Sequence, residues 1–264
     1  MSDTYESSRL LDEYLLFHYA SAEEVLPSDI AWPSEMRNAL GFVHRTVSHF
    51  SKRIAESALD IGCAVGGSTF EMSRTCQKVI GIDFSHSFIN AAEKLRLGQT
   101  IEYCRLEEAQ LTTKLNAKAP ANIDPSRIRF HHGDAMNLSS SLGSFDRVHA
   151  ANLVCRLPEP LRFLQRLPTL LNSGGELVLA TPCTWLAEFT PPQNWPTGST
   201  FDWLHETLSP DFELQHQCDE PFLIRETARK FQWSRSLVTT WRKNKANFFM
   251  WLVGQRGFSD RSIP

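Results

Sequence analysis

A glycine-rich turn between two apolar segments, within residues 57–83, limits the folds open to this chain most strongly. The first apolar segment, 58–61, leads into three closely spaced glycines. A helix is predicted from about Ser68, and the second apolar segment ends in Asp83. A strand, a glycine turn, a helix and a strand ending in an acid form the first half of a doubly wound α/β sheet. Ligands of such sheets bind outside the carboxyl ends of the strands.

The turn fits two classes of ligand. Gly62, Gly67 and Asp83 stand roughly where a dinucleotide fingerprint places two of its glycines and its ribose-binding acid. The middle glycine of that fingerprint lets the backbone approach a pyrophosphate, and here the position is Ala64. A methyl group obstructs a pyrophosphate but not a ligand without phosphate. The sequence therefore favours S-adenosylmethionine over NAD(P).

Asp60 ends a strand that should be buried on both faces, where an unpaired carboxylate is costly. One candidate partner is the ligand, because S-adenosylmethionine brings an ammonium group and a sulfonium centre. The other is the set of backbone N–H groups of the turn itself. The two interpretations do not exclude each other.

Composition excludes several classes of protein. The 264 residues carry a formal charge of −3, from 27 basic and 30 acidic residues, without a basic stripe, so no nucleic-acid partner is expected. No apolar run approaches the length of a membrane span, and the polar N-terminus predicts no signal peptide. Six dispersed cysteines with no C-x-x-C spacing predict reduced, buried thiols, no metal and a cytoplasmic protein.

The N-terminal region is predicted to be helical. Residues 5–19 have apolar side chains at helical spacing and several aromatics, so this helix either packs on the rim of the sheet or forms a lid over the ligand. Residues 34–53 predict a second helix, with Ser34 as its N-cap.

The middle of the chain continues the sheet. Residues 87–97 predict a helix, about 99–119 an inserted β-hairpin, and 128–130 a short strand followed by Gly133, Asp134 and Ala135. The list of predicted elements then continues with a strand at 145–152, a helix from about 158 to 171 that ends with a left-handed glycine at 174–175, and a buried strand at 176–181.

The C-terminal region begins with a long aromatic and Pro-rich loop, 184–198, which leaves the sheet on the ligand side. We expect it either to wall a substrate pocket or to be a self-packed surface loop. The segments 208–218 and 231–241 predict the last two strands, joined by 220–230. The whole chain is expected to be one domain, in which 1–55 is a helical lid, 56–183 the cofactor-binding core, and 184–264 the substrate loop and final strands.

D-x-G-x-x-x-G from Asp60, an acid at Asp83 and G-D-A at 133–135 resemble the motifs of class I methyltransferases. The resemblance implies a Rossmann-like fold with a seven-stranded, mostly parallel sheet, helices on both faces and an antiparallel last strand. It also implies S-adenosylmethionine as cofactor and S-adenosylhomocysteine as product. The expected cofactor-binding residues are Asp60, Gly62, Cys63, Ala64, Gly66, Asp83, Phe84, Ser85, Gly133, Asp134, Ala135, Asn152 and Tyr14.

Several peripheral segments resemble a narrower family. Y-E-x-x-R-L-L-x-E-Y-L-L-F-H-Y at 5–19, T-W-L-A-E-F-T at 184–190, P-F-L-I-R-E-T at 221–227 and K-F-Q-W at 230–233 are similar to the C-terminal methyltransferase domain of ovothiol-biosynthesis enzymes. That resemblance implies N-methylation of the imidazole of 5-thiohistidine to give ovothiol A. It also implies a sulfoxide synthase as partner, either as another domain or as a separate protein. Formation of the C–S bond is not expected of this chain.

The implied reaction is an in-line attack of a ring nitrogen on the methyl group, so catalysis is mainly positioning and desolvation. His18 and Glu13 are the candidate proton acceptors, and Asn152 is expected near the reacting methyl. The substrate carboxylate favours an Arg fork. The expected substrate-binding residues are Tyr5, Arg9, Phe17, Tyr19, Arg156, Trp185, Phe189, Trp195 and Arg225. The alternatives are a methyltransferase for another small amine or acid, an NAD(P)-dependent oxidoreductase, and a non-catalytic binding module.

Overall fold

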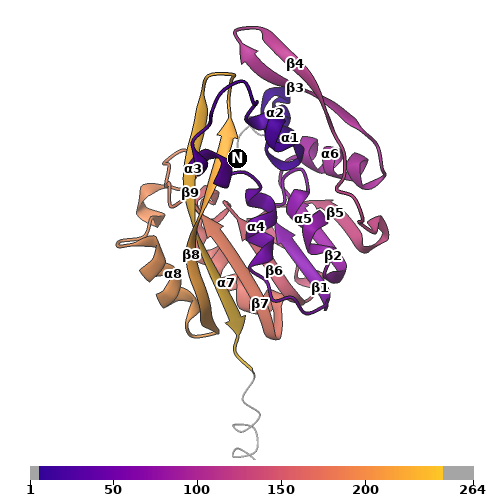
Figure 1. The fold of residues 1–264 in the computed structure, drawn as a ribbon. Helices are drawn as coiled ribbons and strands as arrows, with labels where there is room; N and C mark the ends of the chain where they lie inside the picture. The colour runs from indigo at the N-terminus through magenta and orange to yellow at the C-terminus, as the bar shows by residue number, and fades with distance from the viewer. Residues whose placement is uncertain (1–5, 246–264) are drawn as a thin grey trace, which may run out of the picture.

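The fold is built on a seven-stranded sheet with the strand order β5-β2-β1-β6-β7-β9-β8 (Figure 1). The computed structural model describes residues 6–245. Neighbouring strands from β5 to β7 are parallel, whereas β9 is antiparallel to both β7 and β8. The strands of this sheet are β1 (Ala55–Ile61), β2 (Cys76–Asp83), β5 (Ile128–His132), β6 (Phe145–Ala151), β7 (Leu171–Thr181), β8 (Phe212–Arg225) and β9 (Phe231–Lys243). The predicted fold class is therefore confirmed.

Helices cover both faces of the sheet because the central strands are apolar on both sides. In β1 the last four residues are buried, and in β7 the last seven. One core cluster packs α7 and α8 on one face, and two others pack α4, α5 and α6 on the opposite face. The α-helices are α1 (Ser8–Tyr19), α2 (Ala22–Val25), α3 (Ser34–Asn38), α4 (Phe42–Ser48), α5 (Gly67–Met72), α6 (His86–Arg96), α7 (Pro160–Leu170) and α8 (Thr200–Leu208).

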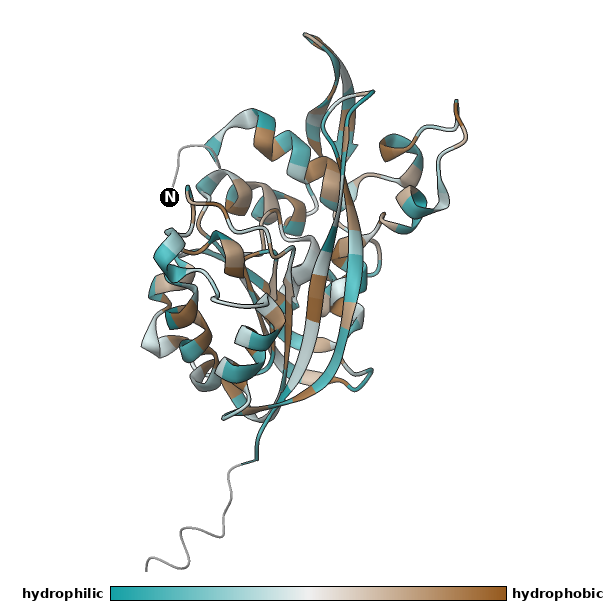
Figure 2. Cartoon of the chain, turned by 90° about the vertical axis from the view of Figure 1, so that its left-hand side faces the viewer, coloured by the Kyte–Doolittle hydropathy of each residue, from teal (hydrophilic) through white to brown (hydrophobic). Residues whose placement is uncertain are grey.

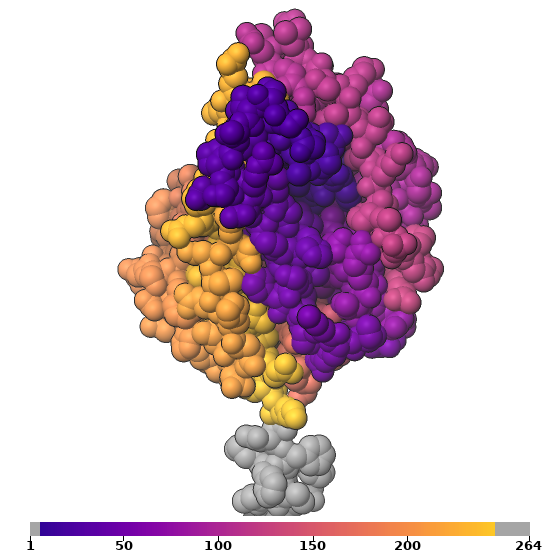
Figure 3. Space-filling view, viewed as in Figure 1, coloured from indigo at the N-terminus to yellow at the C-terminus, as the bar shows by residue number. Residues whose placement is uncertain are grey.

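The N-terminal region forms the predicted helix α1 but not the predicted second helix. In place of one helix over 34–53, the chain makes α3 and α4, separated by Gly41 with φ 71°. A left-handed residue interrupts an α-helix and lets α4 turn onto the sheet. Figure 3 shows the N-terminal segment, in indigo, between the yellow β8–β9 pair and the magenta β3–β4 hairpin.

The hairpin predicted at about 99–119 forms a separate two-stranded sheet, β3 (Ile101–Glu108) and β4 (Leu111–Ala117), at the top of Figure 1. Arg225 of β8 pairs with Glu107 of β3, with Nη2 2.7 Å from a carboxylate oxygen. The hairpin is thereby tied to the far edge of the main sheet.

Two predicted boundaries are wrong. The connector expected at 220–230 is mostly strand, because β8 continues to Arg225, opposite Phe231. Figure 2 shows that this long β8–β9 pair carries both hydrophobic and hydrophilic residues along its length. Gly174 is left-handed (φ 74°), but α7 already ends at Leu170 and the glycine lies within the span of β7.

All six cysteines are free thiols, and Cys63, Cys76 and Cys155 are buried as predicted. Cys104 and Cys218 are half-buried and Cys183 is exposed, so burial of all six was a wrong prediction. None of the described helices has the length and hydrophobicity that crossing a bilayer requires.

Candidate functional site

The turn between β1 and α5 uses its backbone N–H groups internally. Those of Gly62 and Cys63 both donate to the Ile82 carbonyl, and that of Ala64 donates to a carboxylate oxygen of Asp83 at 2.8 Å. The N–H of Gly66 donates to the carbonyl of Cys63, so the turn is closed by its own backbone. Dinucleotide-binding turns present these N–H groups to a pyrophosphate. This turn therefore suits a ligand without phosphate.

Three residues other than glycine take left-handed backbone conformations at the carboxyl edge of the sheet. Ala64 (φ 48°) follows β1, Asn152 (φ 55°) follows β6, and Cys183 (φ 54°) follows β7. Such conformations cost about 1–3 kcal/mol each and cluster at functional sites. Their position after three neighbouring strands of one sheet marks this edge as the site.

Asp60 is buried and fully engaged by the protein. Its carboxylate accepts hydrogen bonds from Ser68 (2.6 Å) and Thr69 (2.7 Å) and lies 2.8 Å from Nδ1 of His149. Burial opposes the charge, but His149 and the two hydroxyls hold the pKa of Asp60 below its ordinary value. The bonds within the protein come from side chains and not, as the second interpretation had expected, from the N–H groups of the turn.

His149 is therefore a site residue that the sequence analysis missed. It lies beside Asp60 in the β1–β6 register, and its Nε2 lies 3.1 Å from the hydroxyl of Thr46 in α4. A histidine among the apolar residues of the second half of β6 was the available signal. The chain Thr46–His149–Asp60 links α4 to the strand that opens the glycine turn.

The carboxyl ends of β2 and β5 bring the next predicted residues together. Asp83 accepts from the N–H groups of Ala64 and Ser85, and burial raises the pKa of Asp83, an effect that these donors oppose. Gly133 donates its N–H to the Asp83 carbonyl, and the Asp134 carboxylate accepts from Met136 N–H. The two acids therefore stand at the carboxyl ends of adjacent strands, Asp83 as the last residue of β2 and Asp134 two residues after β5.

The other predicted residues around this crevice have specific places. Ser85 caps α6, while the exposed ring of Phe84 lies 5.8 Å from that of His132. Ala135 packs against the core beneath α7. Asn152 accepts from the hydroxyl of Ser236 (2.6 Å), so its amide is oriented by β9.

The C-terminal end of helix α1 contacts the glycine turn. Tyr19 donates its hydroxyl to the Val65 carbonyl, and Nδ1 of His18 accepts from Gly67 N–H at 3.2 Å. The ring of Tyr14 packs 4.7 Å from that of Phe88 in α6. Burial lowers the pKa of His18 to about 4, with the Asp60 charge opposing, so the ring is neutral near pH 7. Because Nδ1 accepts, the ring proton of the neutral form resides on Nε2.

A cavity of about 350 Å³ lies between α1, α4 and the first turn of α5. Phe17, His18 and Gly67 line it, together with Glu71 and Arg225. Glu71 was missed by sequence reasoning, although it lies one helical turn after Gly67 and so shares its face of α5. The cavity does not include Asp83 or Asp134, so it adjoins the glycine turn on the side away from those acids.

The predicted arginines separate into three environments. Arg225 is buried, donates to Val25 and Glu107, and has an Nε without a hydrogen-bond partner among the described residues. Arg156 donates to the Thr184 carbonyl and lies over the ring of Phe189. Arg9 is exposed and pairs with Glu13.

A second cavity of about 200 Å³ lies between α1 and the β3–β4 hairpin, and Arg9, Glu13 and Arg225 line it. The two predicted proton acceptors are therefore not brought together, since His18 lines the larger cavity and Glu13 the smaller. Tyr5 lies outside the described residues.

The aromatic residues of the 184–198 loop pack within the protein and do not line either cavity. The indole of Trp185 donates to Thr200 and stands edge-on to Trp203, and that of Trp195 donates to the Thr190 carbonyl. The loop thus packs against α8 and against the segment before α7, to which Thr190 and Asn194 donate hydrogen bonds.

Comparison with known proteins identifies methyltransferases as the similar proteins. A family model described as a methyltransferase domain matches residues 59–179, which run from β1 into β7. A demethylmenaquinone methyltransferase of Lactococcus lactis is 28% identical over 137 residues, which cover 51% of this chain and 45% of that enzyme. The match thus spans less than half of the relative.

Solved structures show the similarity over a longer stretch. The N-methyltransferase NodS of Bradyrhizobium japonicum, in complex with S-adenosylhomocysteine, aligns with a TM-score of 0.50 and 15% identity over 88% of this chain and 98% of its own. A putative S-adenosylmethionine-dependent methyltransferase of Listeria monocytogenes aligns with a TM-score of 0.51 and 12% identity, over 78% and 99%. The chain has the fold of a class I methyltransferase.

With this class I methyltransferase fold, the domain match is consistent with S-adenosylmethionine as the cofactor. The residues present fit that molecule, because the N–H groups of Gly62, Cys63, Ala64 and Gly66 are bonded within the protein and Asp83 ends β2 where a ribose-binding acid belongs. When bound, the cofactor supplies an electrophilic methyl group. The glycine turn, Asp83 and Asp134 are the residues that would hold it.

Proposed function

We propose that this protein transfers the methyl group of S-adenosylmethionine to a ring nitrogen of 5-thiohistidine, giving ovothiol A. The observation that supports a small acceptor most directly is the cavity of about 350 Å³ between α1, α4 and α5. Its volume lies at the lower end of the range for small-molecule sites, which begins near 300 Å³. The resemblance of the α1 and β8 segments to ovothiol-biosynthesis enzymes supports the identity of the acceptor.

Arg225 is our candidate for the acceptor's α-carboxylate. Its guanidinium is positioned by Val25 and Glu107, while the unpaired Nε is a buried donor. Leaving such a donor unsatisfied costs about 1–3 kcal/mol, which an incoming carboxylate would recover. Arg9 and Arg156 stay alternatives that lie outside the larger cavity.

The residues that line the cavity suggest how the imidazole of the acceptor is hydrogen-bonded and where its proton goes. His18 in its neutral form presents Nε2–H and so acts as a hydrogen-bond donor, not as the proton acceptor expected from the sequence. Among the described residues lining the cavity, Glu71 is the only carboxylate, and it bonds to His44 and Arg74. We assign to Glu71 the task of accepting the proton released by the acceptor. The acceptor's nitrogen lone pair then attacks the methyl in line, and catalysis rests on position and exclusion of water.

Two measurements test this proposal in order. Calorimetry with S-adenosylhomocysteine and with NADH should show binding of the first alone; NADH binding would replace the methyltransferase assignment with an oxidoreductase. Turnover with S-adenosylmethionine should then occur with 5-thiohistidine and exceed that with histidine. Turnover on other small amines or acids but not on thiohistidine would keep the methyltransferase and reject the acceptor. Cofactor binding without turnover on any of them would indicate a binding module.

Asp83→Ala should weaken S-adenosylhomocysteine binding by about 1–3 kcal/mol, the scale for losing hydrogen bonds to a charged group. The matched control is Asp202→Ala, which removes an exposed acid from α8, on the other face of the sheet. Equal affinity in both variants would place the ribose elsewhere, and thermal unfolding would show whether Asp83→Ala is folded.

A further inference from the structure

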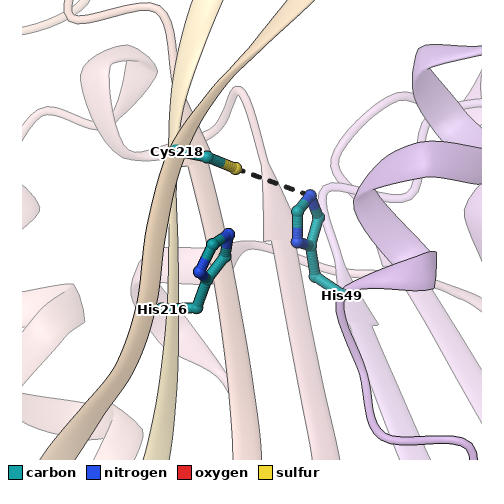
Figure 4. A group of neighbouring side chains, drawn as sticks. All are labelled: His49, His216 and Cys218. Carbon is teal, nitrogen blue, oxygen red and sulfur yellow. Dashed lines mark hydrogen bonds between the residues drawn. The ribbon is translucent and has the colours of Figure 1, made fainter.

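A second group of chemically reactive side chains lies away from the glycine turn, between the end of α4 and the edge strand β8. His49 follows α4, and His216 and Cys218 lie on β8. One ligand-type atom of each residue lies within 4.8 Å of the other two, and Nε2 of His49 is 3.8 Å from Sγ of Cys218. Figure 4 shows the three side chains pointing toward one another from the two elements.

An irregularity in β8 puts these residues on one face. Leu214 lies opposite Trp241, but the register shifts before His216, which lies opposite Thr240. Leu214 accordingly packs in the core with α7 and α8, whereas Cys218 packs in the core with α4. A bulge that inserts one residue reverses the face of all that follow, and bulges commonly re-aim side chains at sites. Without this bulge, His216 and Cys218 would point to the face away from His49.

The geometry does not fit a nucleophilic cysteine relay. In such a relay, the cysteine addresses one imidazole nitrogen and the acid orients the other. Here Cys218 and Glu220 both address Nε2 of His49, at 3.8 and 2.8 Å. A thiol and a carboxylate that converge on one ring nitrogen, with a second imidazole beside them, suit a cation better than a proton relay.

We propose that His49, His216 and Cys218 bind a single Zn²⁺ ion. Two imidazoles and a thiolate form a donor set that Zn²⁺ prefers, with tetrahedral geometry and a fourth position for water or a carboxylate. Binding displaces the proton of the Cys218 thiol and any proton on the ligating imidazole nitrogens, and both go to solvent. Glu220, which contacts the same nitrogen of His49 and pairs with Arg45, is the nearby acid that would fill the fourth position.

The site would fasten the edge strand of the sheet to the helix that walls the larger cavity. Gly41, Val43 and His44 line that cavity at the start of α4, and His49 stands just after the end of the same helix. Cysteine spacing led us to expect no metal, because the ligands of this site come from segments more than 160 residues apart. We expect a structural role for the ion, since the donors lie at the opposite end of α4 from the cavity.

The experiment uses the full chain after removal of metal by a chelator. Zn²⁺ titrated against a chromophoric chelator should bind at one equivalent, with a Kd of about 1 µM or tighter. Co²⁺ in its place should give thiolate-to-metal absorption in the near ultraviolet and the intense visible bands of tetrahedral Co²⁺. Zn²⁺ should also raise the midpoint of thermal unfolding.

Cys218→Ser and His216→Ala should each weaken Zn²⁺ binding at least about tenfold, because even residues that only orient ligands cost 10–100-fold when replaced. Cys218→Ser should also abolish the thiolate absorption. The matched controls are Cys104→Ser, a half-buried thiol on β3, and His205→Ala, an exposed imidazole on α8, and both should bind like the parent chain. Absence of one-equivalent binding, or binding that survives both cluster substitutions unchanged, would overturn the proposal, whatever the methyltransferase activity.

Discussion

Helix α1 and the 184–198 loop have the same kind of sequence but different surroundings. Both are rich in aromatic residues, and both are predicted to contact the substrate. In the structure, Phe17 and His18 of α1 line the larger cavity, whereas Trp185 and Trp195 of the loop pack within their own region. Aromatic content therefore does not distinguish a pocket wall from a surface loop.

The hydrogen bonds of the two segments explain the difference. Tyr19 and His18 bond to Val65 and Gly67, which are 46 and 49 residues away, so α1 is fixed to the glycine turn. Trp195 bonds to Thr190, five residues away, and Trp185 to a residue fifteen away. The loop also makes longer-range bonds, from Thr190 to the Leu157 carbonyl and from Asn194 to the Pro158 carbonyl, but these lead to the segment before α7 and not to the glycine turn. The hydrogen-bond partners of a segment, and not its aromatic content, decide whether it lies against the site.

The largest expected effect comes from displacing α1. In Gly67→Ala the new Cβ would lie 2.6 Å from Nδ1 of His18 and 3.1 Å from Val43, so the imidazole and α1 must move. Overpacking of this kind costs about 1–3 kcal/mol, and we expect kcat/KM for the acceptor to fall about 10- to 100-fold. Steady-state kinetics with varied acceptor would measure it.

The loop offers a matched control in Gly198→Ala, since a Cβ there meets no atom within 4 Å. We expect its kcat/KM to stay within about twofold of the parent, as for surface substitutions that cost little. Equal losses in both glycine variants would mean that the loop also shapes the site, and the contrast between the two segments would fail.

A smaller effect is expected from the aromatic side chains themselves. Phe17→Ala removes a cavity wall that also packs against Phe42 and Phe222, and should reduce kcat/KM about tenfold, or 1.4 kcal/mol. Trp195→Ala removes a ring that is 36% exposed and should leave kcat/KM nearly unchanged. Phe17→Leu keeps most of the packing and should recover part of the loss. A larger defect in Trp195→Ala than in Phe17→Ala would reverse the assignment of the two segments.

Local pattern predicted the strand–turn–helix–strand unit at residues 55–83 well. The spacing from Gly62 to Asp83 is a property of one strand–turn–helix–strand unit, so sequence alone placed the turn, the acid and the order of the elements. The break at Gly41 is also local, but a single glycine within an apolar pattern was compatible with one long helix. Tertiary packing decided between the two.

The remaining site residues depend on contacts that no local pattern contains. The carboxylate of Asp60 was predicted to pair with the ligand or with N–H groups of the turn. Within the protein, it pairs with His149 from a neighbouring strand. The guanidinium of Arg225 is positioned by Val25 and Glu107, which belong to two segments distant in the chain. Periodicity predicts which face of an element is buried, but it cannot predict which polar groups meet across elements.

The smallest expected effect uses a titration that only α1 can produce, because the 184–198 loop contains no histidine. Folding lowers the pKa of His18 from its ordinary value of 6.5 to about 4, mainly through burial. Between these values the unfolded chain binds the proton and the folded one does not. Acid therefore favours the unfolded state, and stability attributable to neutral His18 is lost as pH falls from 6.5 toward 4.

Urea unfolding at pH 7 and pH 5.5 would measure this loss, and His18→Gln supplies the reference. Gln has an oxygen that can accept from Gly67 N–H but does not titrate, so other ionisable groups cancel between the two proteins. The free energy of unfolding of the parent should fall by about 1 kcal/mol more than that of His18→Gln over this interval. Parallel pH dependence would show that His18 is open to solvent and that α1 does not seal the glycine turn. In that case α1 would be no more closely coupled to the site than the 184–198 loop.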